Sequence, residues 1–293
     1  MTKKPVSNVA ASVRQRLLNL RDKTGEDFNA LLTQFAIERF LYRLSRSSFS
    51  DRFVLKGAML FRVWSGSLHR PTKDVDLLGS GEATATAVAA TIRQIISIAV
   101  EDDGILFAAD SVQAEEIRES QEYGGIRVTF IATLDKAVIP LQVDVCFGDA
   151  ITPAAEKRTY PVLIDMEAPR LLMYPVETVI AEKLEAAVKL GTINSRMKDF
   201  YDLLLIFRKY SYDDALLTRA VAQTFARRGT PLPQTVPQGI SDEFGSDPSA
   251  NRLWHEFLAR MQLTNEPTDF AAVIRTLRDR LWPTIVSANR EAS

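Results

Sequence analysis

Hydrophobic residues recur at helical spacing in the first and last parts of the chain, and alternate with polar residues in the middle. Residues 26–46 illustrate the helical pattern, because Phe28, Leu31, Leu32 and Phe35 fall on one side of an α-helix. Helices are expected over residues 7–22, 26–46, 53–64, 82–100, 175–190, 196–209, 212–228, 248–262 and 268–288. Ser7 is the expected N-cap of the first helix.

Strands are expected in a short run at residues 74–78 and in three alternating segments between residues 105 and 147. Helices before and after a group of strands predict an α+β fold with a small central sheet. Two domains are expected: the N-terminal helices with the sheet at residues 1–165, and a helical C-terminal domain at residues 166–293. The stretch GTPLPQTVPQG is rich in proline and glycine, and predicts a linker or flap over residues 229–247.

Composition limits the kinds of site that the chain can form. Cys146 is the only cysteine among 293 residues, which excludes an internal disulfide and favours a cytoplasmic protein. One cysteine and two histidines disfavour zinc, so a bound metal should be a hard cation held by carboxylates. No apolar run reaches the ~18–20 residues of a spanning helix, so no membrane association is expected.

The net charge of −1 conceals a basic N-terminal segment. Residues 1–52 contain ten Lys and Arg against five Asp and Glu. Such a segment could contact the phosphate backbone of a nucleic acid, but solvated helix faces have the same composition, and the pattern alone leaves both readings open.

Three aspartates lie on expected strands among apolar neighbours. Asp74 and Asp76 point to one side of their strand, because side chains alternate. Asp144 lies on a later strand, opposite its apolar face. Such acids would repel one another unless a cation lies between them or some are protonated. A divalent cation such as Mg²⁺ satisfies this requirement, with water and substrate phosphate completing its ligands.

A lysine and two aspartates form a second group. Lys183 falls near the centre of the apolar face of the helix expected at residues 175–190, while Glu182, Glu185 and Lys189 point away. A nucleotide phosphate would suit its ammonium group, although the head could instead reach solvent or meet one Asp. Asp199 or Asp202 on the next helix could pair with Lys183, bind a nucleobase or ribose, or form a structural ion pair.

Other nucleotide or hydrolase motifs are absent from the sequence. There is no G-x-G-x-x-G or Walker A pattern and no G-x-S-x-G nucleophile elbow. His69 is expected to be an exposed loop residue and not the base of a catalytic triad.

The segments FVLKGAMLFRVWSGSLHRPTKDVDLLG, LQVDVCFGD and YPVETVIAEKLEAAVKLGTINSRMKDFYDLL together resemble the abortive-infection AbiE-type (AbiEii, AbiGii) nucleotidyltransferase toxins. These are relatives of the MenT toxins within the polymerase-β-like nucleotidyltransferase superfamily. The likeness covers residues 14–208. It implies a minimal nucleotidyltransferase fold, with a small central mixed sheet flanked by helices and a helical C-terminal region.

The resemblance also implies roles for residues at matching positions. The implied metal ligands are Asp74, Asp76 and Asp144, and the implied nucleotide- or phosphate-binding residues are Lys56, Gly57, Lys183 and Asp199. Asp144 would help to deprotonate the acceptor hydroxyl or bind a second metal, and Asp74, Asp76, Lys183, Asp199 and Asp144 would form the catalytic set. The Gly-Gly or Gly-Ser of the superfamily is Gly57-Ala58 here.

The implied activity is transfer of a nucleoside monophosphate from a nucleoside triphosphate (NTP) to an acceptor hydroxyl, dependent on Mg²⁺ or Mn²⁺. The expected acceptor is the 3′ end of tRNA, and the expected role is that of the toxin in a bacterial toxin–antitoxin system, with a cognate antitoxin as a partner. Two alternatives stay open: a protein as the nucleotide acceptor, or a catalytically silent module that binds nucleotide or antitoxin.

Overall fold

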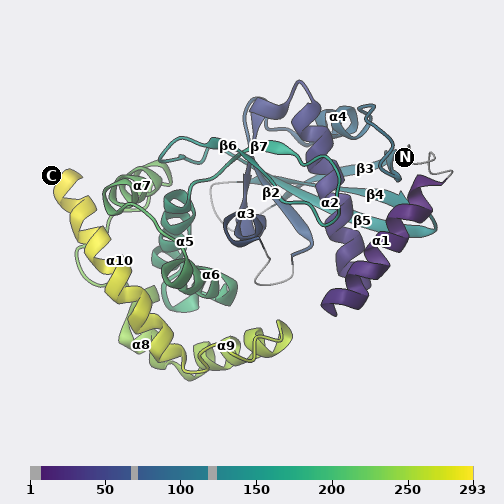
Figure 1. Cartoon of the computed structure of the whole chain (residues 1–293). Coiled ribbons are helices and arrows are strands. Elements are labelled where there is room, and N and C mark those ends of the chain that lie inside the picture. Colours follow the sequence, from purple (N-terminus) through teal and green to yellow (C-terminus); the bar gives the residue numbers. More distant parts are fainter. Residues whose placement is uncertain (1–7, 67–71, 118–123, 293) are drawn as a thin grey trace. The chain divides into compact units, whose positions relative to one another are not determined.

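The structure, a computed structural model, describes residues 8–66, 72–117 and 124–292. It divides into two compact units (Figure 1). The sheet unit comprises Met1–Gly148 and Glu156–Met173, and the helical unit comprises Asp149–Ala155 and Tyr174–Ser293. The chain therefore passes between the units three times. That residues 1–165 and 166–293 act as separate domains stays a prediction.

Seven strands form one mixed sheet in the described part of the sheet unit, in the order β3-β4-β5-β2-β1-β7-β6. β2 runs parallel to β5, and β1 runs parallel to β7, while the other neighbours are antiparallel. The strands are β1 (Phe53–Lys56), β2 (Asp74–Gly79), β3 (Ile105–Ile117), β4 (Gly125–Leu134), β5 (Ala137–Phe147), β6 (Glu156–Thr159) and β7 (Arg170–Met173). This confirms the predicted α+β fold with a central mixed sheet.

The described residues of the sheet unit form four α-helices, α1 (Val9–Thr24), α2 (Phe28–Arg46), α3 (Leu60–Ser65) and α4 (Ala85–Ile96). Of these, α1, α2 and α4 pack against strands. The ring of Phe40 on α2 lies 5.5 Å from that of Phe130 on β4. Ser7 lies outside the described residues, and Asn8 caps α1 by accepting a hydrogen bond from the amide of Ala11.

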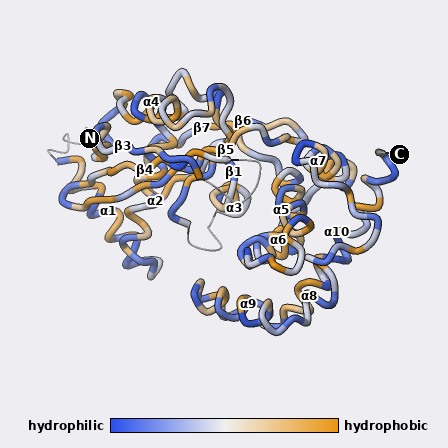
Figure 2. Tube along the Cα trace, turned by 180° about the vertical axis from the view of Figure 1, so that it is seen from behind, coloured by the Kyte–Doolittle hydropathy of each residue, from blue (hydrophilic) through white to orange (hydrophobic). Residues whose placement is uncertain are grey.

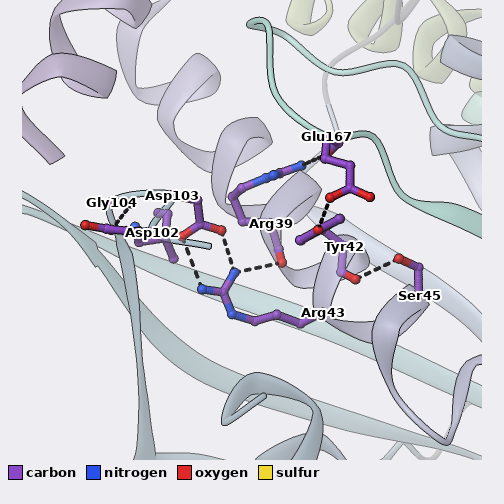
Figure 3. A network of polar contacts seen from close by, with 9 residues as sticks. Arg39, Tyr42, Arg43, Ser45, Asp102, Asp103, Gly104 and Glu167 are labelled. Carbon is purple, nitrogen blue, oxygen red and sulfur yellow. Dashed lines mark hydrogen bonds and ion pairs between the residues drawn. The ribbon is translucent and has the colours of Figure 1, made fainter. Parts of the chain in front are cut away.

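A partly buried polar network also anchors α2 (Figure 3). Arg43 donates to both carboxylate oxygens of Asp103, at 2.7 and 3.1 Å. Arg39 donates to the carbonyl of Glu167 at 2.8 Å, and the Tyr42 hydroxyl donates to the Glu167 carboxylate. These bonds connect α2 to the loop before β3 and to the segment that leads into β7, so they stabilise the sheet unit through residues far apart in sequence.

The helix predicted at residues 53–64 is wrong at its start. Residues 53–56 form β1, which pairs with both β2 and β7. The helical turns begin only at Gly57, with a 3₁₀ turn at Gly57–Met59 followed by α3. A short apolar run suits a buried strand as well as a helix, and here pairing on both sides decides in favour of the strand.

The helical unit contains α5 (Val176–Leu190), α6 (Met197–Lys209), α7 (Asp214–Arg227), α8 (Asp242–Ser246), α9 (Pro248–Arg260) and α10 (Phe270–Ala292). Its core includes Phe200, Phe244 and Phe270, whose rings lie 5.5–5.7 Å apart. Figure 2 shows hydrophobic and hydrophilic residues interspersed along α9 and α10, as expected for helices with one buried face. Residues 230–237 form neither helix nor strand.

Within the described ranges, no helix combines the length and apolar character needed to cross a membrane.

Candidate functional site

Asp74 and Asp76 lie on one face of β2. Both are half-buried, whereas Val75 and Leu77 between and beyond them are buried on the other face. The strand thus holds two carboxylates side by side at a partly solvent-accessible surface, with an apolar anchor behind them. This is the placement that side-chain alternation predicts.

Neighbouring strands bring further polar residues beside this pair. The parallel register of β2 and β5 sets Asp76 opposite Asp144 and Asp74 opposite Gln142. On its other side, β2 pairs with β1, so that Lys56 is opposite Asp76. The sheet therefore brings together four of the predicted residues: Lys56, Asp74, Asp76 and Asp144.

Gly57 begins the turn after β1 and lies against Asp76. Its φ of 74° is in the left-handed region, and a Cβ added there would lie 2.0 Å from Oδ2 of Asp76. A side chain is excluded both by backbone conformation and by the carboxylate. The close approach places the backbone of this turn directly beside an acid of the site.

Arg127 of β4 is a residue of this face that the sequence analysis missed. Its Nε and Nη2 donate to Oδ1 and Oδ2 of Asp144 at 2.9 and 2.8 Å. This hydrogen bonding, reinforced by the charges of Asp144 and Asp74, raises the pKa of the Arg127 guanidinium above its ordinary value. The cation required to relieve repulsion at Asp144 is therefore supplied by the protein itself.

The carboxylates of β2 fit a hard divalent cation. Asp74 and Asp76 offer oxygen donors on one accessible face, and Mg²⁺ commonly takes one or two carboxylates and completes its shell with water and phosphate. Among the described residues, no group of three or more His, Cys, Asp or Glu side chains is arranged to hold a metal. Two carboxylates would leave the other coordination positions of such a cation to water and phosphate.

The second group forms within the helical unit. Lys183 of α5 donates to Asp199 Oδ1 at 2.5 Å and to Asp202 Oδ2 at 3.0 Å, both on α6. The side chain of Asp202 is only 1% exposed, whereas those of Asp199 and Lys183 are 12% and 14% exposed. The ammonium group of Lys183 thus contacts both acids. Of the roles left open for Asp199 and Asp202, the structure shows pairing with Lys183.

Glu182 and Glu185 differ from expectation. They were expected to point away from the core, but both lie at Arg228, at 3.4 and 2.9 Å, and Glu185 is buried. Arg228 also bonds Asp149 at 2.9 Å. Burial disfavours its charge, but the three acids outweigh burial and raise its pKa. Because α5 packs against several neighbours in the helical unit, more than one of its faces is covered.

The remaining predictions concern His69 and the division of the site residues between the two units. His69 lies outside the described residues. The other predicted residues divide between the units: Lys56, Gly57, Asp74, Asp76 and Asp144 belong to the sheet unit, and Lys183, Asp199 and Asp202 to the helical unit.

Comparison with known proteins gives one family model and several solved structures that are similar to this chain. Residues 39–276 match the sequence model described as "Nucleotidyl transferase AbiEii toxin, Type IV TA system". A search of curated proteins finds no match. Among solved structures, MenT4, a nucleotidyltransferase toxin from Mycobacterium tuberculosis H37Rv, is similar with a TM-score of 0.51 and 20% identity, over 95% of this chain and 98% of that chain. JHP933 from Helicobacter pylori has a TM-score of 0.47 and 15% identity, over 89% and 97%.

Proposed function

Because the chain belongs to the AbiEii family of nucleotidyltransferase toxins from type IV toxin–antitoxin systems, we propose that it transfers a nucleoside monophosphate from an NTP to the 3′-terminal hydroxyl of a tRNA, with Mg²⁺ or Mn²⁺. Family membership makes the chain a nucleotidyltransferase toxin. It also implies an NTP substrate, a divalent metal and an antitoxin partner. The tRNA acceptor and the choice of Mg²⁺ are the proposal.

The observation that carries this proposal is the pair of half-buried carboxylates on β2, with Gly57 packed against one of them. Asp74 and Asp76 would hold the metal, which in such enzymes neutralises charge on the phosphates and orients them for attack. The rigid strand fixes the separation of the two acids, and Val75 and Leu77 anchor it from behind.

Lys56 and the turn at Gly57 would bind the phosphates. Lys56 is opposite Asp76 in the sheet register, so a positive side chain originates next to the proposed metal ligands. With no side chain on Gly57, a substrate phosphate could approach the backbone there. Both residues would position the triphosphate with its α-phosphorus open to the acceptor hydroxyl.

In the helical unit, Lys183 and Asp199 are the proposed nucleotide-binding residues. An ammonium group can offset the negative charge that grows on the departing pyrophosphate. Asp202 is nearly inaccessible, so its part is to hold Lys183, whereas the more accessible Asp199 can exchange its bond to Lys183 for a bond to substrate. Asp144 is the candidate base for the acceptor hydroxyl, provided that it is released from Arg127.

The test uses the purified protein with each NTP labelled at the α-phosphate, together with either total tRNA or lysate protein. Label in the tRNA band that requires Mg²⁺ and disappears with Asp76→Asn supports the proposal. Label in a protein band instead would identify a protein acceptor. Absence of label in both, from a protein shown to be folded, would support the silent binding module and overturn the proposal.

A further inference from the structure

Four charged residues, Arg127, Asp144, Asp76 and Lys56, are paired in turn across the strands of the sheet unit. The register sets Arg127 of β4 opposite Asp144 of β5, and Asp144 opposite Asp76 of β2. Because paired residues of neighbouring strands share a face, Arg127 projects on the same side of the sheet as the proposed metal ligands. Asp144 stands between a guanidinium on one side and an acid of the site on the other.

The bond between Arg127 and Asp144 engages the whole carboxylate. Nε and Nη2 each take a different oxygen, at 2.9 and 2.8 Å, in the parallel geometry that makes arginine–carboxylate pairs strong. The amide of Gln142 lies 3.3 and 3.2 Å from the same two oxygens. Any cation that coordinated Asp144 would have to displace these donors from a side chain that is only 14% exposed.

From these contacts we propose that Arg127 withholds Asp144 from metal coordination, so that the chain binds one divalent cation on Asp74 and Asp76, with the guanidinium taking the place of a second metal. This rests on the proposed function, since it concerns the same site. Arg127 is on this view a positioning residue, which acts through Asp144.

Arg127 already supplies a positive charge at Asp144, on the side away from Asp76, which is the charge that a second cation would bring there. The side chain of Arg127 is 36% exposed, so the guanidinium also borders the solvent from which substrate arrives.

The experiment measures Mn²⁺ binding to the full-length protein by electron paramagnetic resonance of the free ion, with calorimetry for affinity. The wild type is expected to bind one Mn²⁺, and Asp76→Asn to weaken that binding at least tenfold. Arg127→Gln is expected to bind a second Mn²⁺ at least tenfold more tightly than the wild type does. Adding Asp144→Asn to Arg127→Gln should remove this second ion.

Two further variants make the result independent of whether Arg127→Gln folds. Asp144→Asn alone should still bind one Mn²⁺, although more weakly than the wild type, because it removes a negative charge beside Asp76. Arg127→Lys keeps the charge but loses the two parallel N–H donors of the guanidinium. It should show an intermediate affinity for a second ion. A wild type that binds two ions, one of them lost with Asp144→Asn, would overturn the inference and leave the proposed function standing. Binding of no Mn²⁺ sensitive to Asp76→Asn would instead count against the proposed function.

Discussion

Gly57 and Asp76 approach so closely that no side chain fits between them: a Cβ on Gly57 would lie 2.0 Å from a carboxylate oxygen of Asp76. The contact joins the end of β1 to the middle of the acidic face of β2. Only glycine fits here, because Asp76, a proposed metal ligand, occupies the space that a side chain would need. The residue is therefore informative about function as well as about backbone conformation.

Gly57→Ala should reduce nucleotide transfer at least tenfold, because the new methyl group must push the Asp76 carboxylate aside. Its unfolding free energy should fall by about 1–2 kcal/mol from the left-handed backbone alone, and further from the clash. Gly66→Ala is a matched control, since Gly66 has a φ of 77° with nothing within 4 Å of an added Cβ. If both variants lost activity equally, the contact with Asp76 would have no catalytic meaning.

Asp76→Asn should lower nucleotide transfer by at least ~100-fold, because several kcal/mol of metal-dependent stabilisation would be lost and each 1.4 kcal/mol corresponds to a factor of ten. Asp110→Asn, at an exposed acid of β3, should leave transfer unchanged. Chelation of divalent metal should reproduce the loss in the wild type, with recovery on addition of Mg²⁺. Full transfer by Asp76→Asn would remove this residue from the site.

Lys183→Met should impair both activity and stability. The substitution keeps an apolar stem but leaves the buried carboxylate of Asp202 without this ammonium group, which should lower the unfolding free energy by roughly 3 kcal/mol. Denaturant unfolding of this variant and of Lys189→Ala, on the same helix, measures the difference. An unchanged unfolding free energy for Lys183→Met would show that Asp202 does not depend on Lys183.

Stability should fall as the pH rises from about 4.5 to about 7. Burial raises the pKa of Glu38 from 4.5 to about 7, against the opposing effects of the Leu163 amide, Arg62 and Arg39. Since the folded state holds this proton more tightly, the contribution is full below the unfolded pKa and is lost as the pH rises through the folded one. The loss amounts to about 3 kcal/mol.

Glu38→Gln should abolish this dependence, because it replaces the acid with a neutral side chain that can still accept from the Leu163 amide. Urea unfolding across the same pH interval provides the measurement. A wild type and a variant with parallel pH profiles would mean that Glu38 does not titrate as described.

The sequence predicted local features of the site better than distant ones. Asp74 and Asp76 could be assigned to one face because alternation along a strand is a local property. Arg127 could not be found this way, because its meaning depends on the register between β4 and β5. Glu185 was misplaced because one amphipathic stripe does not reveal how many neighbours a helix has.

The elements at the centre and edge of the sheet show the same limit. Residues 53–56 carried an apolar pattern common to strands and helices, and only pairing with β2 and β7 resolved it. β6 is fully exposed and β7 has four residues, so neither has a pattern strong enough to be predicted. β7 pairs with β1, which lies much earlier in the sequence, and β6 pairs with β7. Both strands therefore depend on long-range pairing.

The three passages of the backbone between the units mean that no single cut can yield both as intact fragments. A cut after Gly148 leaves β6 and β7 on the fragment that carries the helical unit. A cut after Met173 separates Asp149 from Arg228. Truncated versions of this toxin would contain either β1 without its pairing to β7 or Arg228 without Asp149, one of its three acidic partners. Attempts to express a minimal toxin, or to reconstitute activity from two halves, should retain the interleaved chain.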